Sequence, residues 1–84
     1  MNAAGTILVV EDEPVLRHLV RDTLRREDYR VIEASGVADA IAAAAATPPD
    51  LVVLDLGLAD GDGLRFLEDF RRWSTRPVYL KNRS

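Results

Sequence analysis

The 84-residue sequence has no cysteine, so disulfide bonds, thiolate metal sites and a cysteine nucleophile are all excluded. It also lacks any apolar stretch close to the roughly 20 residues that a membrane-spanning helix needs. Residues 1–5 have none of the basic side chains that open a signal peptide. From these absences we expect a soluble protein of the cytoplasm that makes no membrane contact.

The sequence also has fewer basic than acidic residues. Eleven Lys and Arg stand against 14 Asp and Glu, which gives a net charge of −3. A protein that binds nucleic acid by neutralising phosphates carries the opposite excess. We therefore expect no direct nucleic-acid binding by this chain. Its length allows one small domain, residues 1–84, and we find no linker, repeat or DNA-binding effector domain.

Short apolar segments alternate with segments of helical periodicity along the chain. We expect strands at residues 6–10, 29–34, 50–55 and 77–80. We expect helices at residues 14–27, 37–46 and 64–73. Strands that alternate with helices through short connections indicate right-handed β-α-β units and a parallel sheet. The sequence thus predicts an α/β fold that stops after its fourth strand.

Each predicted helix has its own source of stability. The first carries an apolar face made of Leu16, Leu19, Val20, Thr23 and Leu24. The second is rich in alanine, which has the highest helix propensity and lets a helix lie close to a sheet. For the third helix we expect Leu64, Leu67 and Phe70 to be the anchors. Trp73 is expected to close the core beneath this helix, with Phe70, rather than stack on a ligand.

Two of the predicted strands end in acidic residues. Residues 6–10 run into Glu11 and Asp12, and residues 51–54 run into Asp55. Ligands of parallel sheets bind beyond the carboxyl ends of the strands, so three carboxylates should meet at one edge. Like charges at such distances repel, and a divalent cation relieves that repulsion. A hard-metal site with a reactive Asp55 is one interpretation; a carboxylate that caps the following loop is the other.

The loop after the third strand adds a more specific signal. Residues 54–63 read Leu-Asp-Leu-Gly-Leu-Ala-Asp-Gly-Asp-Gly, and Asp55 follows the acidic pair at a distance of 43 positions (55 minus 12). With these features the sequence resembles the response-regulator receiver domain of two-component signalling, over about residues 5–80. The loop is especially similar to that of Kdp-type members of the OmpR-like branch. The resemblance implies a flavodoxin-like (CheY-like) doubly wound sheet that here lacks the fifth strand and the last two helices.

The resemblance also implies a role for each site residue. Asp55 would be the phosphoacceptor, taking a phosphoryl group from a sensor histidine kinase in a phosphorelay that regulates transcription. Mg²⁺ would be the cofactor, bound directly by Asp12 and Asp55, through water by Glu11, and by the backbone carbonyl of Gly57. Beyond self-phosphorylation and dephosphorylation at Asp55, no enzymatic activity is expected.

Several positions depart from the family pattern. Ala59 replaces a proline of the loop, and Asn82 replaces the Ser or Thr at the tip of the fourth strand. Lys81 stands where an apolar strand residue is usual, and the lysine of the fifth strand has no counterpart. The site is therefore complete on its metal side and incomplete on its phosphoryl side. A phosphorylation-incompetent receiver that acts in protein interaction or oligomerisation is the alternative function.

Some charged residues admit two interpretations. Lys81 and Arg83 are expected to be solvated terminal charges, the alternative being that one of them replaces the missing lysine. His18 is expected to be an ordinary surface residue, because the chain has no second histidine for metal binding or proton relay. Residues 60–63 do not continue as a calcium loop would, and no Gly-rich phosphate loop follows the first strand. Calcium binding and nucleotide chemistry are excluded on these grounds.

The shortened sheet should leave apolar surface exposed. The stripe of the first helix and the edge at residues 78–80 would lose the elements that cover them in a complete receiver. Open strand edges and apolar patches pair with other chains. The sequence therefore predicts a homo-oligomer.

Overall fold

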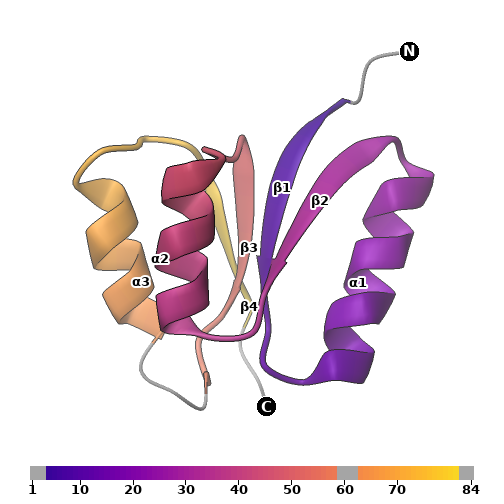
Figure 1. Ribbon diagram of the computed structural model, residues 1–84, viewed down its shortest axis with the longest axis horizontal. Helices are drawn as coiled ribbons and strands as arrows, with labels where there is room; N and C mark the ends of the chain where they lie inside the picture. Colours follow the sequence, from indigo (N-terminus) through magenta and orange to yellow (C-terminus); the bar gives the residue numbers. More distant parts are fainter. Residues whose placement is uncertain (1–3, 59–62, 82–84) are drawn as a thin grey trace.

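The computed structural model describes residues 4–58 and 63–81, which form a sheet with helices on both faces. The elements, in chain order, are β1 (Gly5–Val10), α1 (Pro14–Arg26), β2 (Tyr29–Ala34), α2 (Val37–Ala46), β3 (Leu51–Asp55), α3 (Gly63–Arg71) and β4 (Val78–Lys81). All strand pairs are parallel, in the order β2-β1-β3-β4 (Figure 1). The predicted α/β architecture is confirmed.

The central strand β1 is buried along its apolar part because helices cover both sides of the sheet. Ile7, Leu8, Val9 and Val10 are each at most 2% exposed. Helix α1 lies on one face, and α2 and α3 lie on the other (Figure 1). Continuous apolar runs are typical of strands in such a position. This arrangement holds the carboxyl ends of β1 and β3 side by side.

The larger core lies beneath α2 and α3. Ala40 and Ala44 of α2 are buried against it, in line with the close approach expected of an alanine-rich helix. Phe66 and Phe70 of α3 are fully buried, and their rings stack with centroids 5.5 Å apart. Burial of two aromatic side chains contributes several kcal/mol to the stability of this face.

The phase of α3 differs from the prediction. Leu64 is 47% exposed, so its assignment as an anchor was wrong. Phe66 takes that place, because the helix face of Gly63, Phe66 and Phe70 turns toward the sheet. Leu67 is half-buried against the core. Trp73 is 47% exposed and meets Phe70 in a T-shaped contact with ring centroids 5.0 Å apart, so it does not close the core as expected.

Helix α1 covers its face of the sheet only in part. None of its residues is fully buried; Val20 and Leu24 pack on the smaller core of Ile7, Val9 and Val31. Leu19 is 58% exposed and Thr23 is also exposed, so only part of the predicted apolar face is covered. The helix packs mainly against β2 and to a lesser extent against β1. The predicted partial exposure of this stripe is confirmed.

Element boundaries differ from the prediction by one or two residues. Pro14 opens α1, and the Glu13 side chain caps it by accepting a hydrogen bond from the Leu16 N–H at 2.8 Å. Helix α1 ends at Arg26 instead of Glu27, and α3 ends at Arg71 instead of Trp73. Strand β4 extends to Lys81 because its last residue pairs with Asp55.

Candidate functional site

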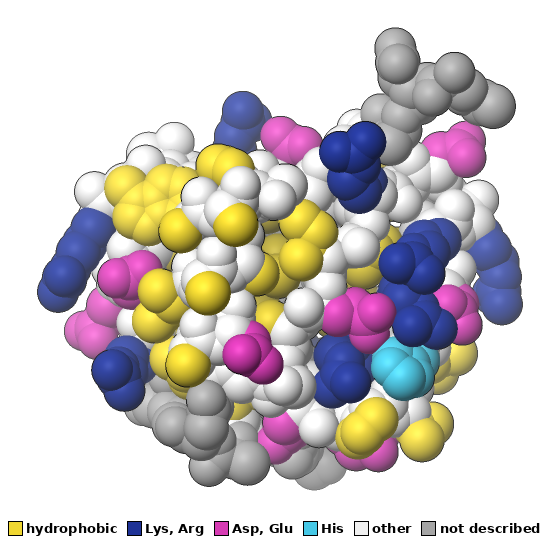
Figure 2. All heavy atoms as spheres, viewed as in Figure 1, with side chains coloured by type: hydrophobic (Ala, Val, Ile, Leu, Met, Phe, Trp, Pro, Cys, Tyr) yellow, Lys and Arg dark blue, Asp and Glu magenta, His cyan; other side chains and the backbone are white. Residues whose placement is uncertain are grey.

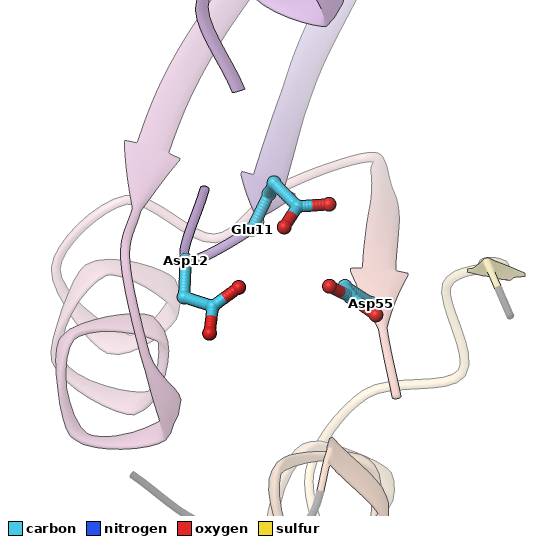
Figure 3. A group of neighbouring side chains, drawn as sticks. All are labelled: Glu11, Asp12 and Asp55. Carbon is cyan, nitrogen blue, oxygen red and sulfur yellow. The ribbon is translucent and has the colours of Figure 1, made fainter. Parts of the chain in front are cut away.

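Three carboxylates converge at the carboxyl edge of the sheet. Glu11 and Asp12 follow β1, and Asp55 ends the neighbouring strand β3. Each residue offers an oxygen that lies within 4.8 Å of the others, and the side chains point toward one another (Figure 3). Glu11 is 2% exposed and Asp55 is 1% exposed, while Asp12 is half-buried. The parallel register therefore gathers the acidic residues that the sequence predicted to be neighbours.

The loop from β1 to α1 fixes the position of Glu11. The Glu13 N–H donates to Oε2 of Glu11 at 3.1 Å. Nη1 of Arg17, in the first turns of α1, donates to the Glu11 carbonyl oxygen at 3.0 Å. Arg17 is held in turn by Glu33 of β2, with Nε 3.2 Å from Oε1. Backbone and side chain of Glu11 are thus both anchored to neighbouring elements.

The loop after β3 fixes Asp55. Its Oδ1 accepts a hydrogen bond from the Gly57 N–H at 3.0 Å. Gly63, the first residue of α3, lies so close that a Cβ atom would be 2.8 Å from the Asp55 carbonyl oxygen and 3.0 Å from Cα of Leu56. Only glycine fits there without displacing backbone. Helix α3 is therefore docked directly behind the strand end that carries Asp55.

The chemistry of this site suits a hard divalent cation. All the clustered side chains are carboxylates, which are the ligands that Mg²⁺ prefers. Their mutual repulsion in a largely buried setting is relieved when a cation shares their oxygens. The half-buried Asp12 leaves the site open to solvent, as Mg²⁺ requires because it keeps several of its waters. The residues present fit Mg²⁺.

A lysine also enters the site. Nζ of Lys81 lies 3.3 Å from Oε1 of Glu11, and the Lys81 side chain is 32% exposed. The expectation that Lys81 is a solvated terminal charge was wrong: as the last residue of β4 it is the register partner of Asp55. Its backbone completes β4, and its aliphatic side chain carries the ammonium group to the acidic cluster. The sequence signal for this contact was the position of Lys81 directly after a predicted strand, at the edge where three acidic residues were expected.

Other predicted residues lie outside this cluster. Gly57 is exposed, two positions beyond Asp55, and the role of its carbonyl as a metal ligand stays a prediction. Ala59, Asn82 and Arg83 fall outside the described residues. His18 lies on the surface of α1, with its side chain 47% exposed and Nε2 3.5 Å from Glu33. Figure 2 shows this single histidine among the basic and acidic side chains that gather on the α1 side.

Sequence comparison assigns the chain that carries this site to a known family. Residues 7–80 match the model of the response regulator receiver domain. The chain belongs to this family. The receiver domain is 46% identical over 74 residues to the KDP operon transcriptional regulatory protein KdpE of Escherichia coli, and 47% identical over 74 residues to KdpE of Mycobacterium tuberculosis. It is thus a KdpE-like receiver domain of a two-component response regulator.

Solved structures agree with this assignment. The N-terminal domain of a response regulator receiver protein from Methanoculleus marisnigri is 38% identical, with a TM-score of 0.85 over 93% of this chain and 66% of that one. The signalling receiver fold predicted from the sequence is therefore confirmed. The alignments to the two KdpE proteins cover 88% of this chain, which spans about a third (33%) of their length. None of the helices in the described part of the receiver domain is long and apolar enough to cross a membrane.

Removal of one charge from the cluster should stabilise the metal-free receiver domain. We expect Asp12→Asn to raise the free energy of unfolding in EDTA by about 1 kcal/mol, because it relieves repulsion from two buried carboxylates. Urea unfolding in EDTA measures this change.

Asp22→Asn is the matched control for Asp12→Asn. The Arg21 guanidinium, hydrogen-bonded at 2.8 Å, holds the pKa of the Asp22 carboxyl below its ordinary value, so this carboxylate already has a favourable partner. Its neutralisation should bring no stabilisation. A loss of stability in Asp12→Asn would contradict the assignment of net repulsion to the cluster.

Proposed function

We propose that Asp55 is the phosphoacceptor of this receiver domain and receives its phosphoryl group from a histidine of a sensor kinase. The observation that carries the proposal is the position of Asp55 at the end of β3, with its carboxylate within 4.8 Å of ligand oxygens of Glu11 and Asp12. Receiver domains of this family interact with sensor histidine kinases. The hydrogen bond from Gly57 holds the carboxylate of Asp55 in one orientation.

The reaction needs a positioned nucleophile more than a base. A carboxylate oxygen of Asp55 attacks the phosphorus atom, an O–P bond forms, and the P–N bond to the kinase histidine breaks. The electron pair of that bond stays on the imidazole nitrogen, which takes up a proton from water. Asp55 becomes an acyl phosphate. Because the Gly57 N–H fixes one oxygen of the Asp55 carboxylate, little reorganisation precedes the attack.

We assign the metal side of the site to Glu11, Asp12 and Asp55. Asp12 and Asp55 would bind Mg²⁺ directly, Glu11 through a water molecule, and the carbonyl of Gly57 would complete the protein ligands. When bound, Mg²⁺ neutralises the charge that develops on the transferred phosphoryl oxygens. The buried Glu11 keeps negative charge near the metal position, and Asp12 faces the solvent through which the metal enters.

The relatives support a proposal for the larger role of the protein. KdpE of Escherichia coli is named a transcriptional regulatory protein, and this chain matches about a third of it. We propose that phosphorylation of Asp55 serves transcription regulation in the same way. The net charge of the sequence is −3, which does not favour direct DNA binding by this chain.

A second candidate is a receiver that no longer switches and acts by association with other proteins. Two observations favour it: Lys81 contacts the acidic cluster, and the edge strand β4 exposes apolar side chains. Tyr79 is 63% exposed and Leu80 is 44% exposed. Exposed edges of this kind are templates for strand pairing.

Phosphorylation separates the two candidates. We expect the full chain, incubated with Mg²⁺ and a small acyl phosphate, to gain the mass of one phosphoryl group, measured by intact-protein mass spectrometry. Asp55→Asn should gain none, because its amide is not a nucleophile. Asp12→Asn keeps the nucleophile and should react far more slowly, since a metal ligand is lost.

The controls for this experiment are circular dichroism of each variant and omission of Mg²⁺. A folded, unsubstituted chain that gains no phosphoryl group would reject the phosphoacceptor and leave the association module. An equal gain in Asp55→Asn would place the modified residue elsewhere.

We further propose that the chain forms a homo-oligomer through α1 and the β4 edge. Light scattering coupled to gel filtration should give a mass above 9.3 kDa, the mass of one chain. Tyr79→Lys, which places charge on the exposed edge, should shift the mass toward the monomer. Val15→Lys tests the exposed α1 surface in the same way, since Val15 is 75% exposed. A monomer of full stability at all concentrations would contradict this proposal.

A further inference from the structure

Lys81 lies at a position from which its ammonium group can contact the acidic cluster. It ends β4 and is the register partner of Asp55, and side chains of directly paired residues leave a sheet on the same face. Strand β3 lies between β1 and β4. The Lys81 side chain therefore passes over the end of β3 to bring Nζ to 3.3 Å from Oε1 of Glu11.

The partner of Lys81 is a deeply buried acid. Glu11 is 2% exposed, whereas the Lys81 side chain keeps 32% of its surface. A charge removed from water to this degree needs compensation, which an ammonium group at hydrogen-bond distance provides. Lys81 is also the only lysine in the sequence. The Lys81–Glu11 ion pair thus joins the positive charge of this lysine to the acidic cluster.

We propose that Lys81 is a built-in counter-cation of the acidic cluster, one that competes with Mg²⁺ for the charge of Glu11 and lowers the affinity of the site for Mg²⁺. The inference rests on the metal site of the proposed function and adds a regulation of that site. It concerns the metal-free state, in which the ammonium group compensates part of the charge that Mg²⁺ would otherwise compensate.

Competition follows from the geometry and the signs of the charges. Mg²⁺ among the oxygens of Glu11, Asp12 and Asp55 would lie within a few ångströms of the ammonium group, and like charges repel at that range. The flexible four-carbon stem of lysine lets the ammonium group move into solvent when the metal arrives. Metal binding then breaks the Lys81–Glu11 contact but leaves the fold intact. The affinity for Mg²⁺ is lowered and not abolished.

Isothermal titration calorimetry with Mg²⁺ on the full chain tests the proposal. Lys81→Met removes the charge and keeps an unbranched apolar stem; its dissociation constant for Mg²⁺ should be smaller by roughly three- to tenfold. Lys81→Arg keeps the charge and should bind Mg²⁺ as weakly as the unsubstituted chain. Arg76→Met is the matched control, since it changes net charge equally.

Arg76 suits this purpose because it lies before β4, at the opposite end of the sheet from the cluster. Its nearest acidic partner is Asp50, 3.9 Å away in an exposed pair. Arg76→Met should therefore leave the Mg²⁺ affinity unchanged. A gain of equal size in Arg76→Met would attribute the effect to net charge and overturn the assignment to Lys81.

The remaining outcomes separate this inference from the proposed function. If all variants bind Mg²⁺ with the same affinity, or Lys81→Met binds it more weakly, the inference is wrong and the metal site stands. If no variant binds Mg²⁺ at all, the metal site of the proposed function fails and the inference fails with it. Support requires tighter binding in Lys81→Met alone.

A second measurement needs no variant at Lys81. Reductive ¹³C-methylation labels the single lysine and the amino terminus while it keeps their positive charges. The Lys81 methyl resonance should shift on Mg²⁺ addition and approach the position of a solvent-exposed lysine, and Asp12→Asn should weaken this response. A Lys81 resonance that stays in place while Mg²⁺ binds would overturn the proposal.

Discussion

Repulsion among three carboxylates is the constraint on which the site depends. Parallel pairing of β1 with β3 brings Glu11, Asp12 and Asp55 to one edge, and two of them are almost fully buried. Folding brings these charges together, although separated carboxylates would be better hydrated and would repel one another less. The core beneath α2 and α3, in which Phe66 and Phe70 stack, stabilises the fold and so offsets this repulsion.

The surrounding residues reduce the repulsion without removing the acids. Backbone N–H groups of Glu13 and Gly57 donate to Glu11 and Asp55, and Lys81 adds a positive charge. Each of these groups compensates part of the charge, and the donor set remains one that Mg²⁺ fits. The carboxylates of the cluster therefore form a set of oxygen ligands that fits a divalent cation.

The sequence predicted the fold and the acidic edge well because both depend on patterns that are local to each strand. Apolar runs that end in Glu11 and Asp55 define strands and their charged tips directly. The burial phase of α3 could not be read in this way: Leu64 and Phe66 are both apolar, and only the approach of Gly63 to Asp55 decides which of them faces the core. The contact of Lys81 with Glu11 depends on β4 lying beside β3, a tertiary relation between residues 70 positions apart.

The account rests on a cation bound at the carboxyl edge of the sheet, and paramagnetic broadening by Mn²⁺ tests this most directly. Mn²⁺ shares the preference of Mg²⁺ for oxygen ligands and broadens NMR signals near its binding site. Substoichiometric Mn²⁺ should broaden the amide signals of Asp12, Leu56 and Lys81, and excess Mg²⁺ should restore them. The signals of Asp22 and Asp50, which are exposed acids away from the cluster, should stay sharp. Equal broadening at all of these residues, or broadening that Mg²⁺ does not reverse, would contradict the account.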